Sequence, residues 1–196
     1  MFEFDPTKKY QRTTKSRAVV RFQDCDPLKH LNNSKYFDYF FNSREDKVPK
    51  LYGIKQSEIY REFNAVWVVY NHQIAYVKPA MMGEWVRIFS RIIWHNHNSL
   101  VIEYFMTDED ETELKTLLWS KLRYVNEKGQ STTHQAKLVE YLSCVAYDDI
   151  EYEDIDYFNL LLRKEAYADF IKMYEAAKKE GITLKIISAT RNFATQ

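Results

Sequence analysis

Residues 24–33 of this chain read Asp-Cys-Asp-Pro-Leu-Lys-His-Leu-Asn-Asn and separate a short apolar stretch from a long aromatic one. The stretch before them, residues 17–23, is rich in β-branched residues and bounded by polar ones, which is typical of a strand. Pro27 supplies no backbone N–H and cannot continue a strand ladder. The segment therefore predicts a turn that ends one strand and leads into a different element.

The element after the turn has the periodicity of a helix. Asn32 or Asn33 can cap it, and we expect the helix to begin at Asn33. Pro49 should kink or end the helix, and Gly53 is a natural stop. A short second helix is expected over 57–62. Aromatic residues at helical spacing predict that the first helix is buried on more than one side: Tyr36, Phe37, Phe40 and Phe41.

Four strand patterns follow these helices, over residues 65–76, 84–94, 99–107 and 112–126. The last three are joined by short polar turns, so they predict an antiparallel meander. With the first strand, they predict a curved sheet that buries one face against the aromatic helix. The expected fold class is α+β.

The two ends of the chain differ from this middle. Residues 1–15 are polar and are expected to form a loose N-terminal arm. We predict a domain over 1–142, with a last helical turn at 139–142. Residues 143–196 are predicted to be an acidic linker and a helical C-terminal extension, with a helix over 156–180.

Composition narrows the classes of function. The 196 residues carry a formal net charge of zero, so no global attraction to nucleic acid or anionic membrane is expected. Two cysteines do not form a disulfide framework, and no apolar run reaches the roughly 20 residues of a membrane span. We therefore expect a cytoplasmic protein that needs no metal and no cofactor.

Two motifs carry a resemblance to a known family. Residues 24–36 have the pattern Asp-x-Asp-Pro-x-x-His-x-Asn-Asn-x-x-Tyr, and residues 76–84 read Tyr-Val-Lys-Pro-Ala-Met-Met-Gly-Glu. The first resembles the signature of the hotdog acyl-CoA thioesterases, especially the 4-hydroxybenzoyl-CoA thioesterase group, and the corresponding turn of the acyl-ACP thioesterases. The second is similar to that family's Tyr-x-x-Pro-x-x-x-Gly-Asp segment. The resemblance covers roughly residues 15–142 and implies a hotdog fold, in which a curved antiparallel sheet wraps a long central helix.

The resemblance also implies a site and a reaction. Asp26 takes the place of the family's nucleophile or general base, the backbone amide near Asn33 would polarise the thioester carbonyl, and His30 would help to position water or the carboxylate. A helix start suits this role because its free N–H groups favour a developing oxyanion, and one such donor is worth roughly 3 kcal/mol. The expected substrate-binding residues are Asn32, Tyr36, Tyr76, Lys78 and Pro79.

The implied substrate is an acyl-CoA, with acyl-ACP as the alternative. The family also implies a homodimer whose sheets join edge to edge with the sites at the interface, and a homotetramer is a further possibility. Three residues depart from the family pattern. Lys29 replaces a glycine found in many relatives, Leu28 replaces an asparagine of the plant acyl-ACP enzymes, and Glu84 replaces an aspartate.

Other interpretations of the same residues remain open. Asp24 and Asp26 could serve only as turn and helix caps, a role we favour for Asp24. Cys25 lies between two acids that raise a thiol pKa, which disfavours a nucleophilic role. His95 and His97 share a strand face, yet no further ligand accompanies them, so a polar turn is favoured over a metal site. The competing functions are a non-catalytic acyl-CoA-binding protein and a hotdog dehydratase or hydratase.

Overall fold

The computed structural model describes residues 5–147. The chain divides into two compact units, Met1–Ile150 and Glu151–Gln196, and all the described residues belong to the first unit. The predicted acidic linker beyond Tyr147 and the predicted helix over 156–180 lie outside the described residues. The elements in chain order are β1 (Thr13–Val19), a 3-10 turn (Phe22–Asp24), α1 (Lys35–Tyr52), α2 (Gln56–Phe63), β2 (Ala65–Tyr76), β3 (Trp85–His95), β4 (Ser99–Asp108), β5 (Leu114–Asn126) and α3 (Ala136–Val145).

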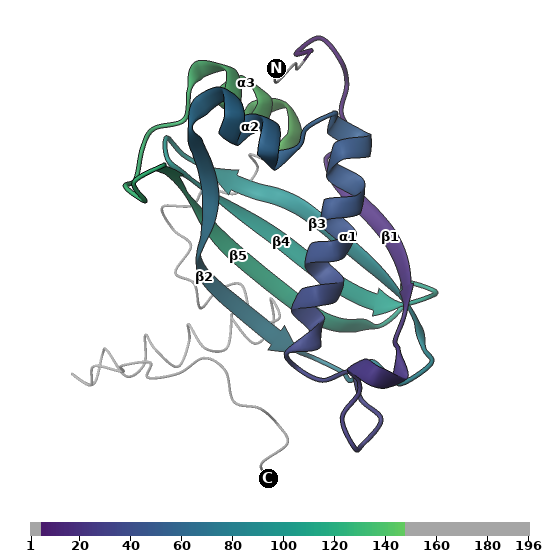
Figure 1. The fold of residues 1–196 in the computed structure, drawn as a ribbon. Coiled ribbons are helices and arrows are strands. Elements are labelled where there is room, and N and C mark those ends of the chain that lie inside the picture. The colour runs from purple at the N-terminus through teal and green to yellow at the C-terminus, as the bar shows by residue number, and fades with distance from the viewer. Residues whose placement is uncertain (1–4, 148–196) are drawn as a thin grey trace, which may run out of the picture. The chain divides into compact units, whose positions relative to one another are not determined.

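The five strands form one sheet in the order β1-β3-β4-β5-β2. All neighbouring strands pair antiparallel, and β3, β4 and β5 form the expected meander. β1 and β2 lie at opposite edges of the sheet, as Figure 1 shows. The chain before α1 and the chain after it therefore end up on opposite sides of the meander.

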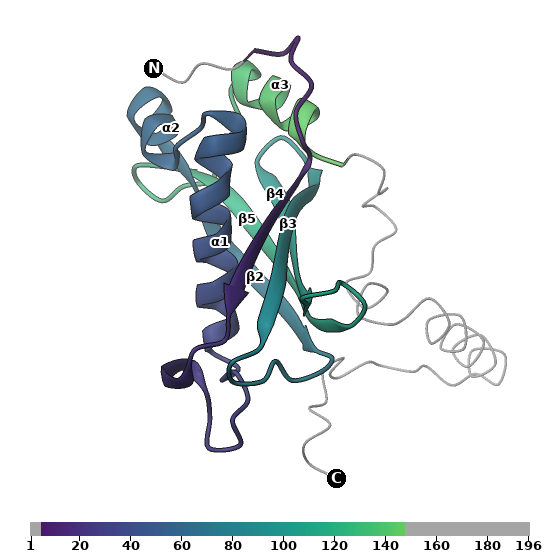
Figure 2. The same ribbon diagram turned by 90° about the vertical axis from the view of Figure 1, so that its right-hand side faces the viewer.

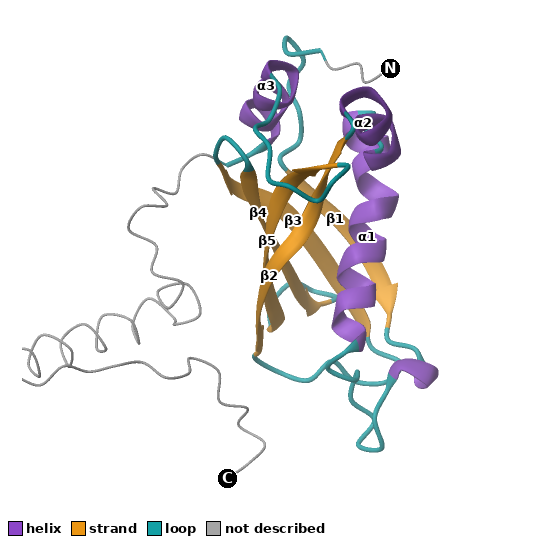
Figure 3. Ribbon diagram, turned by 60° about the vertical axis from the view of Figure 1, so that its left-hand side comes forward, coloured by secondary structure: helices purple, strands orange, loops and turns teal. Residues whose placement is uncertain are grey.

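Helix α1 lies across one face of this curved sheet, seen edge-on in Figures 2 and 3. Its buried side is aromatic, and Phe40 is completely buried while Tyr36 is 2% exposed. The Phe40 ring meets the ring of Tyr104 on β4, with centroids 5.6 Å apart. Alternate residues of β4 all belong to the core: Leu100, Ile102, Tyr104 and Met106. This arrangement confirms the α+β expectation of a curved sheet around a long aromatic helix.

The first strand begins earlier than the sequence predicted. β1 starts at Thr13, so the last three residues of the predicted loose arm are paired with β3. The reason is that Thr14 is completely buried and its hydroxyl lies 2.7 Å from that of Ser90 on β3. The strand also ends earlier, at Val19, because the chain turns into the 3-10 segment at Phe22.

The helices also differ from prediction at their ends. α1 begins at Lys35 rather than Asn33. It runs through Pro49 to Tyr52 and ends at Gly53, whose φ of 69° is left-handed. α3 spans ten residues instead of a single turn, because its apolar side, including Leu138 and Leu142, is fully buried. Within residues 5–147, no helix is long and apolar enough to cross a membrane.

Candidate active site

The turn after β1 is held by the side chain of Asp26. Its Oδ1 atom accepts the backbone N–H of Leu28 at 2.9 Å and that of His30 at 3.0 Å. The Asp26 N–H donates in turn to the His30 carbonyl at 2.8 Å. Within residues 5–147, Oδ2 of Asp26 accepts no hydrogen bond. One carboxylate oxygen is therefore fixed by the turn, while the other is left for a substrate or a water molecule.

Lys29 sits at the tip of this turn with a φ of 63°, in the left-handed region. Glycine adopts that conformation without the steric cost that a side chain brings. Lys29, which stands where many relatives have glycine, therefore adopts a backbone conformation that suits glycine better. The turn forms in spite of it because the Asp26 side chain and backbone close it.

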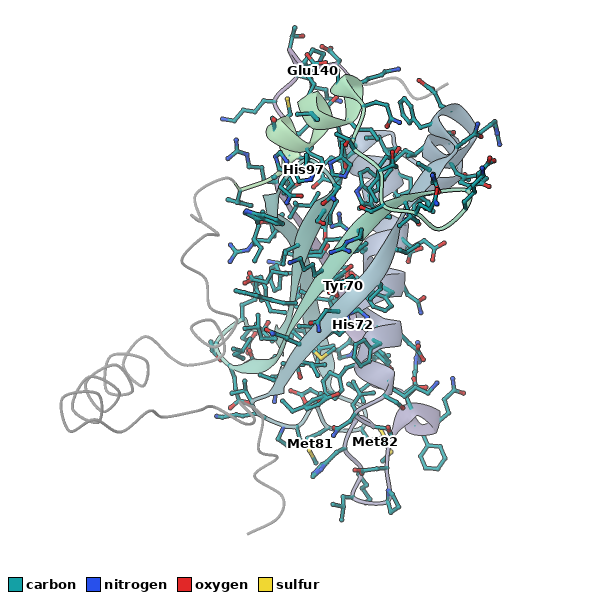
Figure 4. All side chains as sticks on the ribbon, turned by 90° about the vertical axis from the view of Figure 1, so that its left-hand side faces the viewer. Tyr70, His72, Met81, Met82, His97 and Glu140 are labelled. Atoms are coloured by element: carbon teal, nitrogen blue, oxygen red, sulfur yellow. The ribbon has the colours of Figure 1, made fainter. Side chains whose placement is uncertain are left out.

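The two motifs lie side by side in the structure. The Leu31 N–H donates to the Ala80 carbonyl at 2.8 Å, and the Met82 N–H donates to the Lys29 carbonyl at 2.9 Å. His30 and Met81 form an antiparallel bridge between these bonds. In Figure 4, Met81 and Met82 mark the end of the molecule at which α1 begins. A short two-stranded ladder thus joins the two motifs beside the start of the helix.

Asn32 and Asn33 shape the entrance to α1. Oδ1 of Asn32 accepts both the N–H and the hydroxyl of Ser34, at 3.0 and 2.8 Å. The N-cap of α1 is Ser34, whose side chain makes no capping bond, so the predicted cap at Asn32 or Asn33 is wrong. Asn32 instead holds Ser34 in place from two residues before it. The Asn33 N–H donates to no acceptor within residues 5–147, whereas the Asn33 carbonyl accepts the Tyr76 hydroxyl at 2.8 Å. The N–H of Asn33 is thus available one residue before the N-cap of α1, while the second motif fixes the Asn33 carbonyl through Tyr76.

Asp24 has a different environment from Asp26. Its carboxylate accepts the hydroxyl of Tyr39 at 2.9 Å. Burial and the negative charge of Asp24 raise the pKa of Tyr39 to about 12, so the phenol keeps its proton and donates. The bond ties the turn to α1, which is the structural role expected for Asp24.

Cys25 lies between the two acids. Burial, together with the carboxylates of Asp24 and Asp26, raises the pKa of its thiol, in the direction that the sequence predicted. A thiol with a raised pKa is a poor nucleophile at neutral pH.

The other expected substrate-binding residues surround this site at different depths. Tyr36 is 2% exposed, and its hydroxyl accepts the Ala80 N–H at 3.1 Å, so it supports the second motif from the core side. Pro79 and Lys78 are exposed, and Lys78 forms an ion pair with Glu113. The Tyr76 ring packs edge-on against Tyr36 at 5.2 Å. Tyr76 therefore contacts the segment before α1 directly, with Tyr36 beneath it, whereas Lys78 is paired toward β5.

Lys115 on β5 completes the second motif and was not singled out in the sequence. Its ammonium lies 2.9 Å from Glu84 and 2.7 Å from Glu113, and the residue is only 6% exposed. Burial alone would lower the pKa of Lys115, but its hydrogen bonds to the two glutamates outweigh burial and raise it. Glu84 also accepts the Met81 N–H at 2.7 Å. The sequence gives no sign of this cluster, because Glu84 is distant in the chain and only the fold brings it to Lys115 beside the nearby Glu113.

A cavity of about 740 Å³ lies between the sheet and the C-terminal half of α1. Its wall includes Arg44 of α1, Trp67 of β2 and Tyr104 of β4. From Lys35 to Arg44 the helix rises about 14 Å, so the cavity is separated from the Asp26 turn by roughly half the helix. The molecule therefore combines a polar turn at one end of α1 with a largely apolar chamber farther along it.

Comparison with known proteins agrees with this arrangement. The model of the thioesterase-like superfamily matches residues 20–140, and the chain belongs to that superfamily. This membership confirms the expected enzyme class, thioester hydrolase. No curated protein gives a significant match.

Solved structures show the same fold at low sequence identity. The YbaW probable thioesterase from Escherichia coli is 20% identical, with a TM-score of 0.60 over 67% of this chain and 98% of that one. Slr0204 from Synechocystis, a 1,4-dihydroxy-2-naphthoyl-CoA thioesterase, is 10% identical, with a TM-score of 0.59 over 68% and 95% of the two chains. The 12:0-ACP thioesterase from Umbellularia californica is 13% identical, with a TM-score of 0.65 over 74% and 55%. These likenesses confirm the hotdog fold.

Proposed function

We propose that this protein is an acyl-CoA thioesterase with Asp26 as its catalytic carboxylate; an acyl-ACP is the less favoured substrate. The observation that carries the proposal is the Asp26 side chain, held by two amides through Oδ1 and left open at Oδ2, beside the available amide of Asn33. A thioesterase needs a nucleophile or base and an oxyanion donor at one carbonyl. The turn and the helix start supply one of each.

In the proposed reaction, the thioester carbonyl oxygen accepts the Asn33 N–H. Asp26 takes a proton from a water molecule that attacks the carbonyl carbon, or else attacks that carbon directly to form an anhydride that water then opens. The C–S bond breaks, and the departing thiolate takes up a proton to leave as the free thiol. The products are a carboxylic acid and coenzyme A, and no metal or redox cofactor takes part.

The surrounding residues have supporting roles in this proposal. His30 is held at the turn by its N–H bond to Asp26 and by the bridge to Met81, which suits a residue that positions the water. Asn32 fixes the helix start, and Tyr76 fixes the Asn33 peptide. Lys78 and Pro79 are exposed and suit contacts with the coenzyme A portion.

The proposed assembly is a homodimer through the free edge of β2. Its outward-facing apolar residues are unusually exposed, and Val69 and Tyr70 reach 50% and 60%. Tyr70 is labelled on this strand in Figure 4. An exposed apolar edge strand is a template for pairing with another chain. An antiparallel pair of β2 strands would bring the Tyr76 end of one strand beside the Ala65 end of the other, which places each site next to the interface.

The dimer has its own test by light scattering after size-exclusion chromatography. Val69→Lys should convert a dimer into a monomer, because a charge would be buried at the edge. Val139→Lys is the matched control, since Val139 is 40% exposed and belongs to α3 rather than to the edge strand. A Val69→Lys protein that keeps the mass of the wild type would contradict the β2 interface.

The test of the activity is hydrolysis of a panel of acyl-CoAs, with the released thiol measured by a colorimetric reagent. Turnover of at least one member above the uncatalysed rate is expected. Tight binding of the same esters with no thiol release would instead favour the alternative, a non-catalytic acyl-CoA-binding protein. Hydration of an enoyl-CoA without thiol release would favour the dehydratase or hydratase class. We further propose that the protein acts in the cytoplasm, in lipid metabolism.

A further inference from the structure

Arg44 is a charged residue in the wall of the cavity, and the proposed hydrolysis at Asp26 gives it no role. Its guanidinium donates one hydrogen bond, of 3.1 Å, to the hydroxyl of Ser90, a residue that is 1% exposed. Within residues 5–147, no carboxylate lies within ion-pair distance of Arg44, although exposed Glu45 also contributes to the cavity wall. A guanidinium has five N–H donors, and the partly buried Arg44 uses one of them within the described residues. Arg44 therefore offers unused donors to whatever occupies the cavity.

Tyr104 supplies a second unused donor at the same place. It lies directly opposite Ser90 in the β3–β4 ladder, on the face toward α1, and is 3% exposed. Its hydroxyl makes no hydrogen bond within residues 5–147. Burial raises the pKa of Tyr104, so the phenol keeps its proton. Arg44 and Tyr104 both line the cavity, and both adjoin Ser90, the first by a hydrogen bond and the second by strand pairing. The hydroxyl is not one of the fully buried polar atoms that lack a partner, and Tyr104 lines the cavity, so the hydroxyl faces its accessible space.

The rest of the cavity is mostly apolar. Its inner wall is built from buried aliphatic residues of β3, β4 and α3, among them Ile92, Ile102 and Leu142. Its exposed members at the start of α2, Lys55, Gln56 and Ser57, open it toward solvent. A ligand that fits such a chamber is an apolar chain carrying one anionic acceptor that reaches Arg44 and Tyr104.

We propose that Arg44 and Tyr104 bind a carboxylate at the far end of an acyl chain, so that the preferred substrates are acyl thioesters with a terminal carboxyl group. The substrate preference rests on the proposed thioesterase function, whereas the carboxylate site itself does not. Because the helix rises about 14 Å from its start to Arg44, the acyl chain must be a long one. The same chemistry could come from a free fatty acid, and the experiment separates these two sources.

The binding arm uses isothermal titration calorimetry with dodecanoate and dodecanol, which share a chain and differ in the carboxylate. The wild type should bind dodecanoate roughly tenfold to hundredfold more tightly, as a charge-assisted hydrogen bond predicts. Arg44→Gln should abolish that advantage. Lys50→Gln, the same charge change on the exposed side of α1, should preserve it.

Equal binding of the two ligands by the wild type, or an advantage that survives Arg44→Gln, would overturn the site. If Arg44→Gln does not fold, Tyr104→Phe should reduce the advantage severalfold, and an undiminished advantage would overturn the site.

The turnover arm compares kcat/KM for dodecanedioyl-CoA and dodecanoyl-CoA. The proposal predicts at least a tenfold preference for dodecanedioyl-CoA that disappears in Arg44→Gln. Faster hydrolysis of dodecanoyl-CoA by a wild type that selects dodecanoate in the binding arm would identify a free fatty acid as the ligand and refute the substrate preference. Hydrolysis of neither ester, with carboxylate-selective binding intact, would refute the thioesterase and support the site.

Discussion

The ion cluster around Lys115 should contribute measurably to stability. Breaking a fully buried pair typically costs 3–5 kcal/mol, and exposed pairs are worth about 0.2–1 kcal/mol. The Lys115 side chain is 7% exposed, while those of Glu84 and Glu113 are 21% and 34% exposed. Both acids keep another partner, since Glu84 accepts the Met81 N–H and Glu113 pairs with Lys78. Lys115→Met should therefore lower the free energy of unfolding by about 2 kcal/mol, between the two limits.

The assay is urea unfolding followed by circular dichroism, run as a double-mutant cycle with Glu84→Gln. The two changes should couple by about 1 kcal/mol, because each removes a charge from the same pair. Lys35→Met is the matched control, since Lys35 forms an exposed pair with Asp38. A loss below about 0.5 kcal/mol for Lys115→Met, or strictly additive effects, would refute the assignment of this cluster as a support of the second motif.

Two further predictions concern backbone strain and pH. Lys29→Gly should raise the free energy of unfolding by about 0.5–1 kcal/mol because glycine accepts the left-handed conformation, and Lys29→Ala should give no such gain in urea unfolding. His134 accepts the Trp67 indole N–H at 2.9 Å, and burial lowers the pKa of its imidazole from 6.5 to about 4. Between about pH 6.5 and about pH 4, His134 binds a proton in the unfolded chain but not in the folded one. The free energy of unfolding should therefore fall as pH drops through this range. A thermal-unfolding series over that range should show a flatter profile in His134→Gln, and identical profiles would contradict the role of His134.

Much of the fold was predictable because the meander follows local patterns. β2 was predicted with the bounds the structure gives, and the three meander strands agree within two residues at each end. The first strand was placed too late because Thr14 and Ser16 look polar in sequence. They become strand residues through hydroxyl contacts with Ser90 and Ser43, and those partners are distant in the chain.

The candidate site was predictable in outline and less so in detail. The motif order indicated that the segments 24–33 and 76–84 belong to one site. The hydrogen bond from the Leu31 N–H to the Ala80 carbonyl shows that the two segments are in contact. The cap prediction was wrong, because α1 begins two residues later than expected and its N-cap is Ser34, which Asn32 holds through the Ser34 N–H and hydroxyl. Arg44 and Lys115 were missed for a common reason, since a charged residue at an inward position reveals nothing until its neighbours are known.

The role of Asp26 is tested most directly by kcat/KM for the best acyl-CoA substrate in Asp26→Asn and Asp24→Asn beside the wild type. In Asp26→Asn the side-chain amide oxygen can still accept the Leu28 and His30 N–H groups, so both variants should fold with unchanged thermal stability. Loss of a catalytic carboxylate should lower kcat/KM for Asp26→Asn by about a hundredfold or more, and Asp24→Asn should stay within a fewfold of the wild type. A folded Asp26→Asn enzyme with full activity would contradict the assignment of Asp26 as the catalytic residue.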